Sequence, residues 1–249
     1  MNIPFHKPII PASLDELYED SIRNGWITTG PITKRFESKL EEIFESDNVI
    51  AVNSCTAALH IALASKNFKP NDKFIVPTYT FVASVEVGEY LGMHPILIDS
   101  QRNGYNIDLN QVEDVLKKDN KIKAIIPVHF AGKTVQMDLI FDLAIKYNLF
   151  VLEDAAESLG STYKAKHTGT FGDIGVLSFN GNKIITTGAG GAIITNKKNY
   201  AKKARHLIAN AKLKGYGYFH DQVGFNYRLP NLNAALGLSQ INKIKKLLN

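Results

Sequence analysis

The feature that most constrains the fold is the regular alternation of short apolar runs with longer amphipathic stretches. The apolar, strand-like runs lie at 49–52, 73–76, 95–99, 122–128, 149–152, 174–179 and 192–195. Stretches with helical periodicity lie at 12–24, 33–46, 53–65, 108–118, 137–147 and 197–210, with a final helix after residue 224. Such alternation predicts a mostly parallel sheet with helices on both faces. We therefore expect an α/β fold: a three-layer α/β/α arrangement around a mostly parallel mixed sheet.

The bulk composition is typical of one globular domain. The chain has 249 residues, of which 45% are hydrophobic and 21% charged, which is enough for one large core. No apolar run approaches the roughly 18 residues of a membrane-spanning helix, and the N-terminal residues lack the layout of a signal peptide. The single cysteine, Cys55, excludes an internal disulfide framework. These observations predict a cytoplasmic domain covering 1–249 without a membrane partner.

The positive charge does not indicate a nucleic-acid partner. The formal net charge is +5, which by itself is compatible with nucleic acid or an anionic surface. The lysines are scattered over stretches with helical periodicity, and no basic stripe interleaved with aromatic residues is present. We therefore interpret most of them as solvated helix faces.

A lysine between two strand-like runs is the first candidate for chemistry. Lys183 lies in GDIGVLSFNGNKIITTGAGGAIITN (172–196), which is rich in glycine and contains the hydroxyls of Ser178, Thr186 and Thr187. Most lysines are solvated surface residues, and Lys183 alone would be interpreted in that way. A lysine partly withdrawn from water among hydroxyls can instead act as an amine nucleophile that forms Schiff bases. We predict this second role.

A carboxylate upstream supports that prediction. In LFVLEDAAESLG (149–160) a buried-strand pattern ends in Glu153 and Asp154, and ligands of α/β sheets bind beyond the carboxyl ends of strands. Pyridoxal phosphate needs a lysine for its aldehyde and an acid that keeps its ring nitrogen protonated. The alternative is that Asp154 only caps the following turn. With Lys183 downstream, the cofactor interpretation is favoured, and no metal is predicted.

Three segments together resemble the DegT/DnrJ/EryC1/StrS family of pyridoxal-phosphate-dependent sugar aminotransferases, which have the aspartate-aminotransferase fold (fold type I). They are EDAAES (153–158), GDIGVLSFNGNK (172–183) and TTGAGG (186–191). The resemblance extends from GWITTGP (25–31) to GFNYRLPNLNAALGLSQ (224–240). It implies transfer of an amino group, with glutamate as the usual donor, to a nucleotide-linked keto-sugar used for surface polysaccharides. The signature around Lys183 is most similar to that of enzymes acting on UDP- or dTDP-linked 4-keto-6-deoxy sugars.

The resemblance also implies which residues hold the cofactor. It places the cofactor phosphate near Thr56 and Ala57, with Ser178 completing the site, and stacks Phe81 on the cofactor ring. A phosphate at the start of the 53–65 helix is physically reasonable, because a helix N-terminus presents free N–H groups. The alternative is that Asn53 or Ser54 merely caps this helix.

Two further segments are implied in substrate binding and assembly. By resemblance, the loop with Trp26, Thr28, Thr29 and Gly30 lines the sugar-nucleotide site, although a plain Gly-Pro turn is the alternative. Relatives place the region of Asn226 and Arg228 at a homodimer interface, where it reaches the neighbouring subunit's cofactor phosphate. The alternative there is an ordinary surface loop.

Glu157 and His129 need separate comment, because the family resemblance does not give either of them a clear role. Many family members have glutamine or histidine at the position of Glu157, where the side chain bonds the cofactor's phenolic oxygen. Glutamate departs from this, and would have to share a proton with that oxygen or turn away from it. His129 ends the run at 122–128, and a lone histidine there is more often structural than catalytic, so we assign it no role.

The length of the chain leaves alternatives. Family members continue into a small C-terminal domain, and we interpret the present sequence as the cofactor-binding large domain without it. One alternative is therefore a pyridoxal-phosphate-binding fragment or regulator that cannot turn over. Another is a sugar dehydratase of the same family, but those enzymes carry histidine at the position of Lys183.

Overall fold

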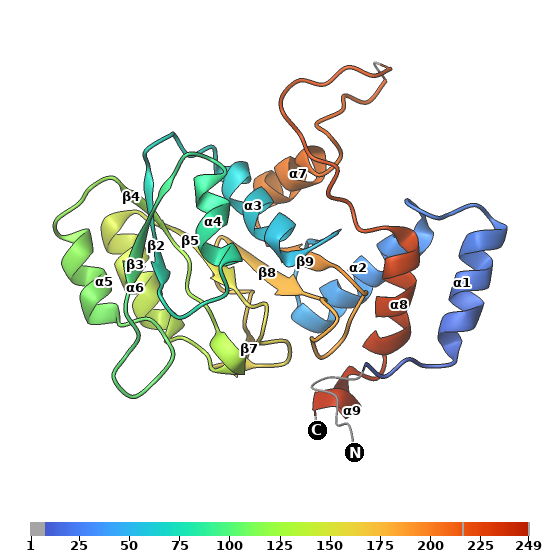
Figure 1. Ribbon diagram of the computed structural model, residues 1–249, viewed down its shortest axis with the longest axis horizontal. Helices are drawn as coiled ribbons and strands as arrows, with labels where there is room; N and C mark the ends of the chain where they lie inside the picture. Colours follow the sequence, from blue (N-terminus) through green and yellow to red (C-terminus); the bar gives the residue numbers. More distant parts are fainter. Residues whose placement is uncertain (1–7, 216, 249) are drawn as a thin grey trace.

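A seven-stranded mixed sheet forms the centre of the computed structural model, which describes residues 8–215 and 217–248 (Figure 1). Residues 1–7, 216 and 249 of the predicted domain lie outside the described residues. The strand order is β1-β9-β8-β5-β4-β2-β3. The strands are β1 (Val49–Val52), β2 (Lys73–Pro77), β3 (His94–Ile98), β4 (Ile122–Ile125), β5 (Phe150–Asp154), β8 (Ile174–Ser178) and β9 (Gly191–Ile194).

Only β9 runs against the other strands of this sheet. The pairs β2–β3, β2–β4, β4–β5 and β5–β8 are parallel, whereas β8–β9 and β1–β9 are antiparallel. The sheet is therefore mostly parallel and mixed, as predicted. Each strand run expected from the sequence is present, with ends that differ by a few residues.

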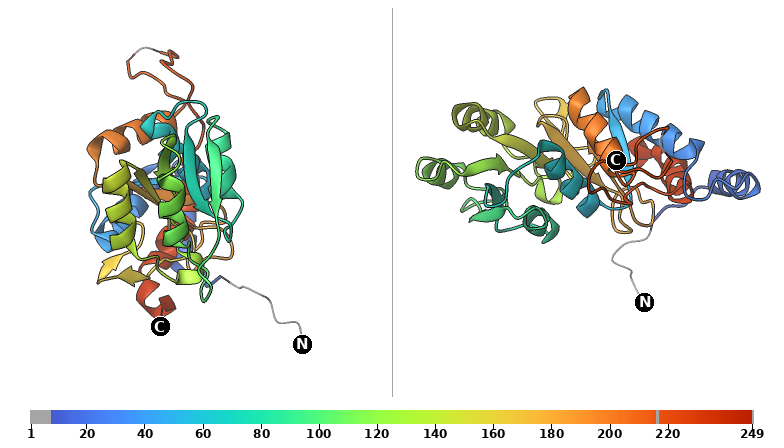
Figure 2. Two further views of the ribbon diagram at one scale, coloured as in Figure 1. Left: turned by 90° about the vertical axis from the view of Figure 1, so that its left-hand side faces the viewer. Right: turned by 90° about the horizontal axis from the view of Figure 1, so that it is seen from above.

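Helices cover both faces of the sheet, which confirms the three-layer expectation (Figure 2). On one face lie α3 (Cys55–Lys66), α4 (Ala83–Glu89) and α7 (Lys198–Leu207). On the other lie α2 (Pro31–Phe44), α5 (Leu109–Leu116), α6 (Met137–Tyr147) and α8 (Asn231–Ile241), with α1 (Ser13–Arg23) packed on α8. Because strand side chains alternate between faces, even-numbered residues of β5 contact the α3 layer and odd-numbered ones the opposite layer.

Several short elements were not expected from the sequence. They are α4, the 3-10 turn η1 (Phe130–Gly132) and the ribbon of β6 (Thr162–Tyr163) and β7 (Lys166–His167), whereas α9 (Ile244–Leu248) lies in the final helical region expected after residue 224. The α4 sequence, ASVEVGE, contains two β-branched residues and a glycine, which are poor helix formers. Packing against α3 stabilises it instead of intrinsic propensity.

Phe36 links α2 to the segment that carries the candidate lysine. Its ring is fully buried and packs edge-to-face on the ring of Phe179, just after β8, with 5.3 Å between the ring centroids. Aromatic pairs at this distance contribute beyond simple burial. The pair therefore fixes the start of the loop that leads to Lys183.

We predict that Phe36→Ala lowers the free energy of unfolding by about 3–5 kcal/mol, because it leaves a cavity that the core fills only partly. Urea denaturation followed by circular dichroism measures this. The control is Ile145→Ala on α6, where the side chain is 80% exposed and the expected change is about 0.5 kcal/mol or less. Equal losses in the two variants would contradict the assignment of Phe36 to the core.

Candidate active site

A cavity of about 360 Å³ lies where β5 and β8 end and α3 begins. It brings together six of the nine residues predicted to bind the cofactor: Thr56, Phe81, Asp154, Glu157, Ser178 and Lys183. The rest of its wall includes Thr80, Val128, Phe130, Ala156, Asn180, Asn182 and Gly190. These residues span more than a hundred positions of the chain, so the fold assembles the site from separate segments.

Asp154 projects from the last position of β5 into this cavity. Its carboxylate accepts the Ser84 hydroxyl at 2.6 Å and the Ala156 N–H at 3.1 Å. Burial raises the pKa of Asp154, while these two hydrogen bonds and the charge of Lys183 act in the opposite direction. A carboxylate has about four acceptor positions, so two donors leave capacity for another.

Ser84 is a site residue that the sequence reasoning missed. Its hydroxyl lies 2.9 Å from that of Thr80, so Thr80 can donate to Ser84 while Ser84 donates to Asp154. Ser84 lies on α4, one of the helices not expected, and is 70 positions from Asp154. A buried-helix serine has no local sequence signal for such a contact.

Lys183 also lines the cavity and lies in the loop between β8 and β9. Its side chain is largely buried, and its Nζ is 3.3 Å from Oε1 of Glu157. Glu157 Oε2 accepts the N–H of Ala131 at 3.0 Å, so this carboxylate joins the lysine to the η1 turn. Of the described residues that line the cavity, Lys183 is the sole lysine or arginine.

The hydroxyl-rich surroundings expected for Lys183 are only partly present. Ser178 lines the cavity, but Thr186 and Thr187 do not. Their hydroxyls donate to the carbonyls of Phe179 at 3.0 Å and Ala189 at 2.8 Å, and both residues are buried. These threonines therefore shape the loop that carries the lysine, instead of facing its amine.

The N-terminus of α3 forms a third part of the site. Ser54 caps this helix, because its Oγ accepts the Ala57 N–H at 3.0 Å. This confirms a capping role for Ser54, whereas Ala57 does not line the cavity, and its place beside a phosphate stays a prediction. Thr56 lines the cavity, and its N–H lies in the first turn, where no earlier helical carbonyl can accept it.

Gly191 allows this helix end to approach the sheet. A Cβ built on Gly191 would lie 2.8 Å from the backbone of Cys55 and 2.8 Å from the carbonyl oxygen of Leu177. Any side chain there would push α3 away from β8 and β9. The glycine-rich sequence after Lys183 thus has a packing role at the cavity.

The wall of the cavity fits the predicted cofactor, pyridoxal phosphate. The cavity offers a buried carboxylate with spare acceptor capacity at Asp154, an amine at Lys183, and hydroxyls with a helix N-terminus at Thr56 and Ser178. Phe81 adds a ring surface that is 72% exposed. Asp154 matches the ring nitrogen of the cofactor, Lys183 its aldehyde, Thr56 and Ser178 its phosphate, and Phe81 the face of its ring.

The other predicted binding residues do not line this cavity. Thr29, Gly30 and Arg228 line a separate cavity of about 500 Å³ that also contains the Glu37–Arg205 ion pair. Trp26 and Thr28 are exposed and line neither cavity. Asn226 forms an isolated bridge with Ala209.

A buried asparagine that the sequence reasoning did not single out for binding holds the loop after α1. Asn231, at the start of α8, accepts the N–H groups of Ile32 and Thr33 and donates to the carbonyl of Trp26. Gly30 is required there, because a Cβ would lie 2.7 Å from the Asn231 side chain. The loop is therefore a fixed element, and its glycine has a structural reason.

Neither a metal site nor a membrane-spanning helix is found in the part of the chain that the structure describes. Within residues 8–215 and 217–248, no three His, Cys, Asp or Glu side chains are grouped so that they could hold a metal ion. No helix among the same residues is long and apolar enough to cross a bilayer.

The sequence pattern of the DegT/DnrJ/EryC1/StrS aminotransferase family matches residues 8–249. The chain belongs to this family. Members bind pyridoxal phosphate, in agreement with the composition of the cavity.

Individual relatives agree with this assignment. The chain is 39% identical over 242 residues to the GDP-perosamine synthase of Escherichia coli O157:H7, covering 97% of this chain and 66% of that protein. Among solved structures, the Helicobacter pylori aminotransferase PseC, involved in pseudoaminic acid biosynthesis, matches with a TM-score of 0.93 at 28% identity, covering 99% of this chain and 67% of PseC. The PLP form of Spr1654 from Streptococcus pneumoniae matches with a TM-score of 0.91 at 29% identity, covering 99% and 68%. The chain thus spans about two thirds of the length of these proteins.

We predict that cofactor-free Asp154→Asn is more stable than the wild type near neutral pH. Because burial raises the pKa of Asp154 above 3.8, the folded state binds more protons than the unfolded state between 3.8 and the raised value. The contribution of Asp154 to stability therefore falls as pH rises through that window. Asparagine lacks this charge, and its amide can donate to Ser84 once that hydroxyl turns to Thr80.

Urea unfolding midpoints of the two cofactor-free proteins, measured from about pH 4 to about pH 8, test this linkage. The advantage of Asp154→Asn should grow with pH and vanish toward the acid end. A difference that is constant with pH would show that Asp154 is not held as a costly buried charge.

Proposed function

We propose that this chain is the cofactor-binding part of a sugar aminotransferase that uses Lys183 and Asp154 to hold pyridoxal phosphate. The observation that carries the proposal is that one cavity is lined both by a largely buried lysine and by a buried carboxylate with spare acceptor capacity. Family membership supports the same reaction class.

Each residue has a chemical task in this proposal. When bound, the cofactor would supply an electron sink for negative charge that develops on the substrate carbon next to its nitrogen. Asp154 accepts a hydrogen bond from the ring nitrogen and keeps it protonated. Lys183 holds the cofactor through Nζ and, when Nζ is released, moves a proton as general acid and base. Thr56, Ser178 and the N-terminus of α3 hold the phosphate, and Phe81 covers the ring.

Glu157 restrains the lysine in this arrangement. Its carboxylate is within ion-pair distance of Nζ and is anchored on the Ala131 N–H. Because the Glu157 carboxylate is anchored, it holds Nζ of Lys183 at the wall of the cavity. This gives the glutamate, which departs from the usual glutamine or histidine, a role that does not require a bond to the phenolic oxygen.

We further propose a nucleotide-linked keto-sugar as amino acceptor and glutamate as donor. The relative with 39% identity bears the name GDP-perosamine synthase, which favours a GDP-linked sugar over the UDP- or dTDP-linked sugars expected from the sequence. Assay of GDP-, UDP- and dTDP-linked 4-keto-6-deoxy sugars with glutamate distinguishes these. Amination of the GDP-linked sugar is expected, and turnover of only a UDP- or dTDP-linked sugar would restore the first expectation.

We predict that Lys183 alone carries the cofactor after borohydride reduction of the protein with pyridoxal phosphate. Mass spectrometry of the digested protein should find the added mass on the peptide that contains Lys183. Lys183→Ala should lose the label and the visible absorbance while it keeps its unfolding midpoint, because the change removes no core side chain. A label spread over surface lysines, or one retained in Lys183→Ala, would contradict the proposed function.

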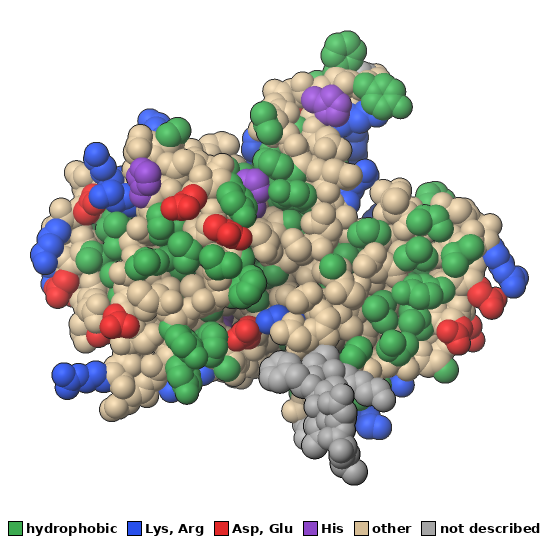
Figure 3. All heavy atoms as spheres, in the orientation of Figure 1, with side chains coloured by type: hydrophobic (Ala, Val, Ile, Leu, Met, Phe, Trp, Pro, Cys, Tyr) green, Lys and Arg blue, Asp and Glu red, His purple; other side chains and the backbone are tan. Residues whose placement is uncertain are grey.

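A second copy of the chain completes the site in this proposal. Asn226 and Arg228 are outside the walls of the cofactor cavity of their own chain. They follow an arm between α7 and α8 that projects from the body, where Tyr218 and Phe219 are 87% and 68% exposed (Figure 1). Hydrophobic side chains also gather over α1 and α8 on this face (Figure 3). Exposed apolar groups of this kind favour association.

Mixing two inactive variants tests this assembly. Lys183→Ala cannot be labelled, and Arg228→Ala should be labelled poorly at limiting cofactor, because its partner's phosphate donor is missing. In a mixed dimer, the Arg228→Ala copy receives an intact arginine, so labelling of about a quarter of all sites should return. Absence of recovery, together with a monomeric mass in sedimentation, would contradict the shared site.

A further inference from the structure

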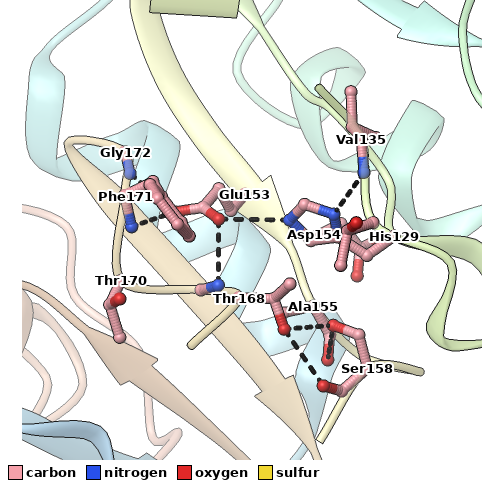
Figure 4. A network of polar contacts seen from close by, with 12 residues as sticks. His129, Val135, Glu153, Asp154, Ala155, Ser158, Thr168, Thr170, Phe171 and Gly172 are labelled. Carbon is pink, nitrogen blue, oxygen red and sulfur yellow. Dashed lines mark hydrogen bonds and ion pairs between the residues drawn. The ribbon is translucent and has the colours of Figure 1, made fainter. Parts of the chain in front are cut away.

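Glu153, the neighbour of Asp154, is enclosed by a hydrogen-bond network that faces away from the cofactor cavity (Figure 4). Its side chain is fully buried, and its carboxylate accepts four donors. Oε1 accepts the N–H groups of Phe171 and Gly172, each at 2.6 Å. Oε2 accepts the N–H of Gly169 at 2.9 Å and lies 3.1 Å from Nε2 of His129.

The protonation of His129 follows from its two contacts. Nδ1 accepts the backbone N–H of Val135 at 3.1 Å, so Nδ1 carries no proton. The ring proton is therefore on Nε2, which donates it to Glu153. The His129 ring is also fully buried. Every polar atom of this pair thus has a partner, and the negative charge of Glu153 is matched by four N–H groups.

The network connects three segments that border the cofactor cavity. His129 lies between Val128 and Phe130, which both line the cavity. Its backbone N–H also donates to the Asp154 carbonyl at 3.0 Å, and the Asp154 N–H donates to Pro127 at 2.9 Å. The end of β5 is therefore held in two ways: its backbone bonds to the 127–129 segment, and the Glu153 side chain bonds to His129 and to the turn before β8.

The third segment is the turn before β8. Its amides at Gly169, Phe171 and Gly172 converge on Glu153, and β8 then leads to Ser178 at the cavity. Because adjacent strand residues point to opposite faces, fixing the side chain of Glu153 on one face fixes the direction of Asp154 on the other. The direction of Asp154 matters, because a displacement of about 1 Å in a group that contacts the ligand can lower the reaction rate about a hundredfold.

We propose that Glu153 and His129 are positioning residues that orient the Asp154 carboxylate toward the ring nitrogen of the cofactor. Neither side chain touches the cavity, so they act through β5 and the segments beside it. This inference rests on the proposed function, because it takes Asp154 to be the partner of the ring nitrogen.

Two substitutions of His129 separate its two contacts. His129→Gln places an amide N–H close to the former Nε2 and keeps a donor for Glu153. His129→Asn places an amide oxygen close to the former Nδ1, keeps the acceptor for Val135 and loses the donor for Glu153. The pair is matched in polarity, so the direction of the difference shows which contact matters: a loss confined to His129→Asn reports the contact with Glu153, and a loss confined to His129→Gln reports the contact with Val135.

The measurement is a pair of dissociation constants for pyridoxal phosphate and its 1-deaza analogue, in which CH replaces the ring nitrogen. The wild type should favour pyridoxal phosphate, because only this ligand can donate to Asp154. His129→Asn and Glu153→Gln should reduce this preference about tenfold. This is the effect expected when the hydrogen bond between the ring nitrogen and the charged Asp154 loses its favourable geometry. His129→Gln should keep most of the preference.

Hydrogen exchange gives a readout without cofactor. The amides of 169–172 should exchange faster in His129→Asn than in His129→Gln, because their acceptor is then held less firmly.

The outcomes separate this inference from the proposed function. If the wild type shows no preference for pyridoxal phosphate, the role of Asp154 fails and this inference fails with it. If the wild type shows the preference and His129→Asn and Glu153→Gln retain it, or weaken both ligands equally, only the positioning role is overturned. Loss of the fold in both variants would also contradict it, because the pair would then serve the fold and not the aim of Asp154.

Discussion

The site depends on one buried carboxylate that the protein leaves incompletely bonded. Asp154 sits at the end of a central strand, where burial makes its charge costly, and among the residues that the structure describes only Ser84 and Ala156 donate to it. A protein gains nothing in stability from such a group unless a ligand completes it. The amine of Lys183, the hydroxyls of Thr56 and Ser178 and the α3 N-terminus surround the same space, and they define what that ligand must contain.

The contrast between Asp154 and Glu153 shows how one strand can place two carboxylates in different roles. They are adjacent in sequence, both are buried, and they point to opposite faces of the sheet. Glu153 has four donors and no spare acceptor position, whereas Asp154 has two donors and faces the cavity. The number of donors, and not burial alone, distinguishes a structural carboxylate from one that is available to a ligand.

The fold was predictable from the sequence, and so was the proximity of Lys183 and Asp154 to one cavity, because their signals are local. The alternation of strands and helices requires only periodicity, Asp154 ends a strand, and Lys183 lies in the loop after the neighbouring strand. Ser84 and Asn231 were not predictable as site or loop supports, because their roles depend on partners 70 and 199 positions away. The hydroxyls of Thr186 and Thr187 were misjudged for a related reason: the sequence gives their proximity to Lys183 but not the turn of the loop, which directs them to backbone carbonyls.

The central claim is that Asp154 and Lys183, which line the same cavity, hold one cofactor there. A crystal structure of the chain grown with pyridoxal phosphate tests it most directly. The account predicts density continuous with Nζ of Lys183, the ring nitrogen hydrogen-bonded to Asp154, and the phosphate against the N-terminus of α3. Density for the phosphate in the separate cavity beside Arg228 and Gly30, with the Asp154 carboxylate left without a ligand, would contradict it.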